Sequence, residues 1–117
     1  MLRRTKRRYL ALEIESDAHF ISQEFMNAVW GAVVKLYGEY GASRTGLVLI
    51  DFNETKHLAV IRSTLVALDD VRVALVSIIS ITNKPATIHI VSISGTLKAL
   101  RRKMRNQFQS QSNTRKL

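Results

Sequence analysis

The order in which apolar patterns follow one another constrains the fold more than any other feature of this sequence. Four short apolar stretches are typical of β-strands: residues 9–14, 47–52, 57–62 and 87–93. In the first stretch the apolar residues alternate, so Leu10, Leu12 and Ile14 should share one face of a sheet. Residues 53–56 (NETK) should close a hairpin between the second and third stretches.

Two segments with helical spacing of apolar residues separate these strands. The first should run from about Gln23 to Tyr37, with Ser22 as its N-cap and Gly38 as its C-cap. The second should begin between residues 63 and 70 and end near Thr82. The order β-α-β-β-α-β predicts an α+β chain with an antiparallel sheet in the ferredoxin-like, split βαβ arrangement.

A third helical segment, residues 96–108, is amphipathic and basic. Its apolar stripe should dock this C-terminal helix on the rest of the chain: Leu97, Leu100, Met104 and Phe108. Four cations cluster on the adjoining face: Lys98, Arg101, Arg102 and Arg105. Cations held on a fixed platform suit the phosphates of RNA or DNA, although acidic proteins and membrane surfaces also bind such helices. The narrow apolar face without Trp argues against a membrane.

The positive charge of the chain is concentrated at its two ends. Residues 3–8 hold five of the 18 Lys and Arg residues and residues 98–116 hold seven, whereas neither segment contains Asp or Glu. The five cations of the N-terminal arm are Arg3, Arg4, Lys6, Arg7 and Arg8. All nine acids lie between the two ends, so a near-neutral body with two cationic ends predicts a polyanionic partner. A solubilising tail is the alternative interpretation of the arm.

The length of 117 residues supports one folded domain. We expect a basic arm over residues 1–8, a single domain over 9–108 and a disordered polar tail over 109–117. No apolar core segment of the kind found in signal peptides follows the N-terminal cations, and no apolar run reaches the ~18–20 residues of a membrane span. We therefore expect a soluble, cytoplasmic protein that has neither a signal peptide nor a membrane partner.

The sequence shows no pattern typical of a catalytic or metal site. It has no cysteine, and its three histidines have no metal-binding spacing: His19, His57 and His89. Asp69 and Asp70 are explained by the start of a helix, and Glu13 and Glu15 by a solvated strand edge. We predict no catalytic residue, no metal ligand and no cofactor bound by the chain itself.

A split βαβ sheet with basic flanks invites comparison with the RNA-recognition motif. That motif stacks bases on aromatic residues of its first and third strands. Here the first strand offers only Tyr9 and the third only His57. We therefore expect contacts with phosphates or with nucleic-acid shape rather than base stacking on the open face of the sheet.

The first helix is apolar around more of its circumference than one sheet face requires. One apolar stripe contains Phe25, Ala28, Val29, Ala32 and Leu36. A second stripe beside it contains Met26, Trp30, Val33, Val34 and Tyr37. Together they span about 240°, whereas covering one sheet face needs a little over ~100°. Either another helix covers the excess or a protein partner does, and we predict a partner interface at Met26, Trp30, Val34 and Tyr37.

Five pieces of the sequence, taken in order, resemble one known family. They are residues 6–11 (KRRYLA), 28–30 (AVW), 38–42 (GEYGA), 70–75 (DVRVAL) and 91–98 (VSISGTLK). The family is archaeal ribonuclease P protein component 2, whose eukaryotic relatives serve ribonuclease P and the related mitochondrial-RNA-processing ribonuclease. The resemblance spans roughly residues 6–108. It departs from the family at Ser92 and Ile93, where relatives often have a glycine before the turn.

The resemblance implies a small ferredoxin-like subunit of a ribonucleoprotein that removes the 5′ leader from precursor transfer RNA. Catalysis would belong to the RNA and its Mg²⁺ ions, and the subunit itself would lack a catalytic site. The implied partners are the ribonuclease P RNA, the barrel-fold protein component 3 and the other protein subunits, with a homodimer inside a heterotetramer as a further expectation. Two alternatives remain: a ribosomal or RNA-chaperone module that binds many RNAs, and a protein-only nuclease.

Overall fold

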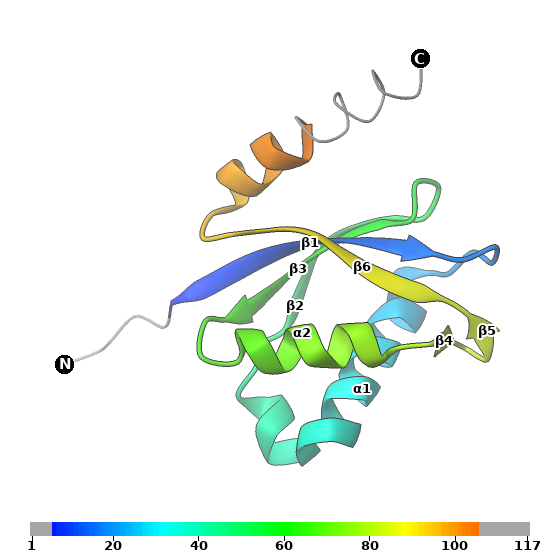
Figure 1. Cartoon of the computed structure of the whole chain (residues 1–117), viewed down its shortest axis with the longest axis horizontal. Coiled ribbons are helices and arrows are strands. Elements are labelled where there is room, and N and C mark those ends of the chain that lie inside the picture. The colour runs from blue at the N-terminus through cyan, green and yellow to red at the C-terminus, as the bar shows by residue number, and fades with distance from the viewer. Residues whose placement is uncertain (1–5, 106–117) are drawn as a thin grey trace.

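A computed structural model describes residues 6–105 of the chain. Its elements in chain order are β1 (Arg7–Glu15), α1 (Ser22–Ser43), β2 (Val48–Asn53), β3 (Leu58–Thr64), α2 (Leu68–Ser77), β4 (Ser80–Ile81), β5 (Lys84–Pro85) and β6 (Thr87–Ser94). The C-terminal helix follows over residues 97–105. Figure 1 shows this last helix apart from α1 and α2, beyond the opposite side of the sheet.

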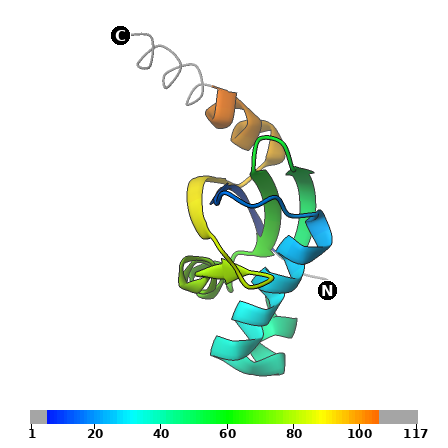
Figure 2. The same cartoon turned by 90° about the vertical axis from the view of Figure 1, so that its right-hand side faces the viewer.

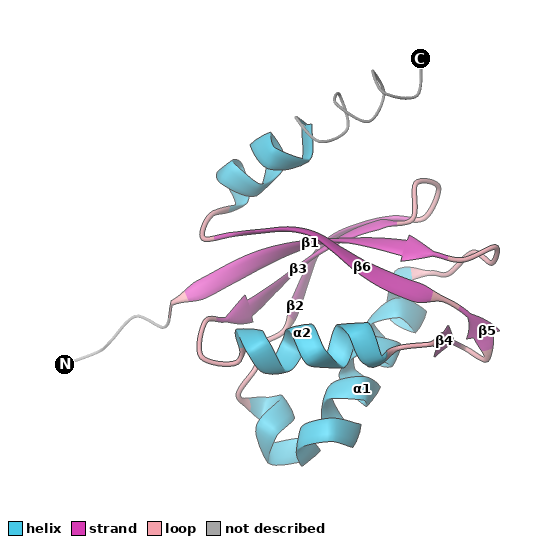
Figure 3. Ribbon diagram, in the orientation of Figure 1, coloured by secondary structure: helices cyan, strands magenta, loops and turns pink. Residues whose placement is uncertain are grey.

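The four long strands form one antiparallel sheet in the order β2-β3-β1-β6. The first and last strands of the β-α-β-β-α-β series are therefore neighbours, as in a ferredoxin-like fold, and the predicted α+β arrangement is confirmed. Figure 3 shows the one addition to it, the short β4–β5 hairpin between α2 and β6.

The two faces of the sheet are covered by different helices, and the alternation in β1 assigns its residues to them. Leu10, Leu12 and Ile14 lie in the main core with residues of α1 and α2. Ala11 points to the other face, where it packs in a smaller cluster with Leu100 of the C-terminal helix. Figure 2 shows the resulting layers, with α1 and α2 below the sheet and the C-terminal helix above it.

Gly38 divides α1 into two parts. Its φ of 74° lies in the left-handed region that glycine adopts without strain, so the straight part of the helix ends where the sequence predicts. One more helical segment continues to Ser43 and was not predicted. It packs closely because Gly41 has no side chain: a Cβ there would lie 2.6 Å from Cβ of Tyr37.

Two predicted helix boundaries are wrong. The N-cap of α1 is Ile21 rather than Ser22, and the Glu24 carboxylate accepts a hydrogen bond from the Ile21 N–H at 3.0 Å. The second helix ends at Ser77, because the residues after it are extended and lead into β4. Thr82 instead lies in the β4–β5 turn with a φ of 50°. Within residues 6–105, no helix has the length and apolarity needed to span a membrane.

Candidate nucleic-acid interface

Antiparallel pairing brings the two cationic ends of the chain together. Tyr9 of β1 pairs with Ser94 of β6, and the C-terminal helix begins three residues later. The guanidinium of Arg8 lies 3.5 Å from the position that a Cβ of Gly95 would occupy. The arm and the C-terminal helix therefore meet where β1 begins and β6 ends, at the left of Figure 1. We call this region the basic end of the sheet.

The C-terminal helix is anchored to the sheet by the predicted apolar stripe. Leu100 is fully buried against Ala11 and Val60, with Leu97 and Met104 half-buried beside it. The first turn is held by the Thr96 hydroxyl oxygen, which accepts a hydrogen bond from the N–H of Ala99 at 3.2 Å. Phe108, the last residue of the predicted stripe, lies outside the described residues. The helix covers part of the sheet face that an RNA-recognition motif uses for bases.

The four predicted RNA-binding cations of this helix are exposed: Lys98, Arg101, Arg102 and Arg105. Among residues 6–105, no hydrogen bond or ion pair engages their charged groups. Lys103 differs, because its ammonium donates a hydrogen bond to the carbonyl oxygen of Ile93 at 3.0 Å. Four cations thus remain available for an external anion, while the fifth holds the helix to β6.

Three predicted cations of the arm belong to the described chain at the same end. Lys6 and Arg7 are exposed, and the carbonyl oxygen of Lys6 accepts a hydrogen bond from the N–H of Leu65 at 2.8 Å. Arg7 and Arg8 are the first residues of β1, which begins two residues earlier than the predicted strand. The arm is therefore fixed to the sheet at its inner end. Arg3 and Arg4 lie outside the described residues.

Two further cations join the basic end although sequence reasoning assigned them to the near-neutral body. Arg62 of β3 lies directly opposite Tyr9 of β1. Arg44 follows α1, and its carbonyl oxygen accepts a hydrogen bond from the Thr64 hydroxyl at 3.0 Å. Only the register of β1 against β3 reveals these neighbours, because both cations are far from the arm along the chain. The basic end therefore comprises Lys6, Arg7, Arg8, Arg44, Arg62 and the cations of the C-terminal helix.

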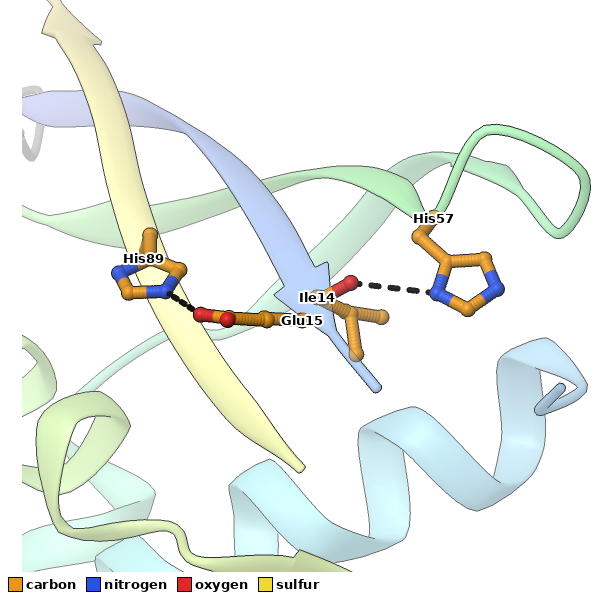
Figure 4. Close-up of polar contacts among 4 residues, drawn as sticks. All are labelled: Ile14, Glu15, His57 and His89. Carbon is orange, nitrogen blue, oxygen red and sulfur yellow. Dashed lines mark hydrogen bonds and ion pairs between the residues drawn. The ribbon is translucent and has the colours of Figure 1, made fainter. Parts of the chain in front are cut away.

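The three histidines lie at the opposite end of the sheet, where they contact protein groups. Figure 4 shows two of them, His57 beside Ile14 and His89 beside Glu15. His57 Nδ1 donates to the carbonyl oxygen of Ile14 at 3.2 Å, and its Nε2 lies 3.3 Å from Nδ1 of His19. His89 Nε2 lies 2.6 Å from a carboxylate oxygen of Glu15. Within the described part of the chain, no three His, Cys, Asp or Glu residues form a group that could hold a metal ion. We call this region the histidine end.

The predicted partner interface on α1 is only partly exposed. Met26 packs against the main core, and Val34 and Tyr37 pack against a cluster that includes Ala74 of α2. Trp30 is the exception, with 44% of its surface exposed. The second helix therefore covers much of the apolar excess of α1, and the C-terminal helix on the other sheet face covers none of it.

A groove with both apolar and polar lining residues lies beside the exposed part of α1. It has a volume of about 280 Å³ and runs between α1 and the segment that follows α2. Leu36 and Ile79 line it, and both side chains are exposed, Ile79 to 81%. Sequence reasoning did not place Leu36 or Ile79 at an interface, because each belongs to an apolar pattern that predicts burial.

Comparison with known proteins gives one consistent result. The Rpp14/Pop5 family matches residues 8–105. The chain is 34% identical over 105 residues to the ribonuclease P protein component 2 of Pyrococcus furiosus, covering 90% of this chain and 88% of that protein. The protein of the same name from Pyrococcus horikoshii is 31% identical over 100 residues, covering 86% of this chain and 83% of that protein.

A solved structure shares the fold. A chain in the cryo-EM structure of yeast ribonuclease MRP superimposes with a TM-score of 0.68, over 96% of this chain and 98% of that chain. The sequence identity of this pair is 17%, so the likeness is one of fold.

Proposed function

The chain belongs to the Rpp14/Pop5 family, and from that membership we propose that it is a non-catalytic, RNA-binding protein subunit of ribonuclease P. In this proposal it supports removal of the 5′ leader from precursor transfer RNA, a reaction performed by the RNA and its Mg²⁺ ions. The observation that carries the proposal is the basic end, where cations from both ends of the chain meet on one sheet.

Fixed cations act on RNA by neutralising phosphates and releasing the counterions condensed around them. Because Leu100 anchors the C-terminal helix, the exposed cations of this helix meet RNA as an ordered array rather than as a flexible tail. Such an array lowers the repulsion where RNA strands crowd together, so the catalytic RNA folds at a lower Mg²⁺ concentration. Phosphate contacts position a protein without reading bases, so sequence preference should be weak.

The two adjacent carboxylates at the start of α2 have structural explanations, which supports a subunit without a catalytic site. Asp69 and Asp70 are exposed in the first turn of the helix, where negative charge complements the helix dipole. Asp69 also pairs with Arg72, one turn along, at 3.9 Å. In this proposal the chain contributes charge and shape to the ribonucleoprotein, and neither an acid, a base nor a metal ligand to the reaction.

We further propose that the groove beside α1 binds another protein subunit. Exposed apolar side chains are typical of an interface: Leu36 and Ile79 line the groove, and Trp30 is exposed on the same helix. The barrel-fold protein component 3 is the partner that the family resemblance suggests. A second copy of this chain, in a heterotetramer with that protein, is the other candidate.

Reconstitution tests the proposed function directly. The purified chain alone should not cleave precursor transfer RNA at any Mg²⁺ concentration. Added to ribonuclease P RNA with the other protein subunits, it should raise the cleavage rate or lower the Mg²⁺ requirement. Cleavage by RNA-free protein that is lost in Asp69→Asn or Asp70→Asn would contradict the proposal and favour a protein-only nuclease.

A ribosomal or RNA-chaperone module remains the second candidate, because phosphate contacts alone favour no particular RNA. Competition distinguishes the two functions. In the presence of the other subunits, ribonuclease P RNA should displace a ribosomal RNA fragment of equal length from the chain. Equal affinity for the two RNAs would favour the generic module.

A further inference from the structure

Arg62 has a feature that the fold itself does not explain. Its Nε atom is buried, yet this N–H has no hydrogen-bond partner in the described part of the chain. The residue as a whole is half-buried in the middle of the sheet, between Tyr9 of β1 and Val48 of β2. Buried side-chain donors in folded proteins are nearly always paired, so an unpaired one calls for a partner from outside.

No carboxylate compensates the charge of Arg62. The ion pairs between described residues join Arg72 to Asp69 and His89 to Glu15, and neither involves Arg62. A half-buried cation without a counter-charge destabilises a folded chain, because water is removed from the cation and no protein group replaces the water. The position therefore lowers stability in the isolated chain unless an external anion binds there.

The neighbours of Arg62 indicate what kind of anion this is. Strand register places Arg7 diagonally across from Arg62 on the same sheet face, a spacing that long side chains can bridge. Tyr9 is two residues from Arg7 along β1, and Val60 is two residues from Arg62 along β3, so all four side chains lie on one face. Tyr9 and Val60 pack with Leu100, so this is the face that carries the C-terminal helix. Two guanidinium groups in reach of one another favour an anion with concentrated charge and several acceptor oxygens.

We propose that Arg62, with Arg7 beside it, forms a binding site for one phosphate group of the RNA backbone. Because Nε is buried in the free chain, the side chain has to turn outward when RNA binds. The guanidinium then donates through Nε–H and an Nη–H at once, a planar fork that matches two phosphate oxygens. This inference rests on the proposed function. It adds a half-buried, oriented contact to the exposed cations, and such a contact fixes the register of the RNA on the sheet whereas exposed cations only attract it.

The test compares two substitutions of Arg62 with a control at the histidine end, using the full chain and a ribonuclease P RNA transcript. Arg62→Lys keeps the charge and removes the fork, and Arg62→Met removes both. Lys84→Met is the control, since Lys84 is an exposed cation of β5, next to Pro85, whose carbonyl oxygen accepts a hydrogen bond from the Ser16 hydroxyl just beyond the end of β1. Each variant is measured for RNA affinity over a range of salt concentrations and for melting temperature. The Nε–H resonance of Arg62 is followed by NMR during titration with RNA, with inorganic phosphate and with polyglutamate.

The proposal expects Arg62→Met to weaken RNA binding about tenfold or more at ~0.1 M salt and to lower the log–log salt slope by ~0.7–0.9. Arg62→Lys should lose much of the affinity with little change in slope, because the charge remains. Arg62→Met should melt at or above the wild-type temperature, since it removes the unpaired buried donor and the uncompensated charge. The Nε–H resonance should move with RNA and not with polyglutamate.

Several results would overturn the inference, and they differ from a failure of the proposed function. Wild-type RNA affinity in Arg62→Met, or a loss equal to that of Lys84→Met, would remove Arg62 from the interface. A resonance that responds to inorganic phosphate and not to RNA would mean an adventitious ion only, and a response to polyglutamate would mean an acidic protein partner. A lower melting temperature in Arg62→Met would make Arg62 a structural residue. If the wild-type chain does not bind ribonuclease P RNA at all, the proposed function fails instead.

Discussion

The two ends of the sheet are built from the same strands, but they differ in whether their charged and polar side chains have partners within the chain. At the histidine end, His89 contacts Glu15 at 2.6 Å and His57 contacts both the Ile14 carbonyl and His19. At the basic end, Arg62 keeps a buried donor without a partner. Among the described residues, no partner engages the charged groups of Lys98, Arg101, Arg102 and Arg105 either, whereas Lys103 is bonded to Ile93. The polar side chains named at the histidine end therefore have partners within the chain, whereas several cations at the basic end have none among the described residues.

This difference separates groups that serve the fold from groups that can serve a partner. An exposed pair such as Glu15–His89 contributes about 0.2–1 kcal/mol and connects β1 to β6. Uncompensated cations contribute nothing to folding and repel one another, so their accumulation at one end indicates selection for binding an anion. Substitutions at the two ends should therefore have separable effects on RNA affinity and on the free energy of unfolding.

The largest expected effect comes from removing the anchor of the C-terminal helix. Leu100→Ala should cost about 2–5 kcal/mol of unfolding free energy, because Leu100 is fully buried between the helix and the sheet. Denaturant unfolding measures the loss, and hydrogen exchange should show residues 97–105 opening first. Lys98→Ala on the exposed face is the control. Equal protection of the helix in Leu100→Ala and wild type would mean that the helix is not held by this contact.

The next largest effect is expected on RNA affinity, when two exposed cations of the C-terminal helix are removed. Arg101→Ala/Arg105→Ala should lower the log–log slope of RNA affinity against salt by ~1.4–1.8, which corresponds to two phosphate contacts. Binding to all RNA sequences should weaken about equally, because phosphates do not specify sequence. Fluorescence anisotropy at several salt concentrations provides the measurement.

Lys103 is the matched control for this experiment, since its ammonium is bonded to the Ile93 carbonyl oxygen. Lys103→Ala should change the salt slope less than Arg105→Ala does. If the two single variants had equal effects, total charge rather than an oriented face would govern binding.

Trp30 should have a moderate effect, and on protein association rather than on RNA. Trp30→Ala is expected to weaken binding of the partner subunit by about 2 kcal/mol, as exposed aromatic residues at interfaces do. The unfolding free energy of the Trp30→Ala variant should fall by less than its binding free energy does, because the Trp30 side chain is 44% exposed. Val33→Ala, one turn along and fully buried, should show the reverse pattern. Calorimetric titration and thermal melts on both variants decide between interface and core.

The smallest effect is expected at the histidine end. His89→Ala should cost at most about 1 kcal/mol of unfolding free energy, because the pair with Glu15 is exposed. It should leave the RNA affinity and its salt slope unchanged. A fall in RNA affinity comparable to that of Arg105→Ala would break the division of the sheet into a structural end and a binding end.

The sequence predicted those parts of the molecule that depend on local pattern. Alternation in β1 assigned Leu10 and Ala11 to opposite faces, and helical spacing predicted the buried stripe of the C-terminal helix. The left-handed conformation of Gly38 followed from its lack of a side chain. These features follow from periods of two and 3.6 residues, which a single sequence displays.

The parts that sequence reasoning missed depend on register and on packing between distant segments. The meeting of Arg62 with Tyr9 requires the alignment of two strands about fifty residues apart, which no local pattern reports. The β4–β5 hairpin was missed because its buried Ile81 continues the apolar pattern of α2. The covering of Val34 and Tyr37 by α2 likewise depends on how two helices meet. Whether Met26, Trp30, Val34 and Tyr37 touch a partner stays a prediction.

The central claim is that RNA binds the basic end and avoids the histidine end. Mapping of backbone amide chemical shifts in the full chain, during titration with ribonuclease P RNA, tests it most directly. The account predicts the largest shifts at the start of β1, at the end of β3 and in residues 97–105, with His19, His57 and His89 unmoved. Shifts of equal size at those histidines, or shifts confined to Trp30 and its neighbours on α1, would contradict the claim.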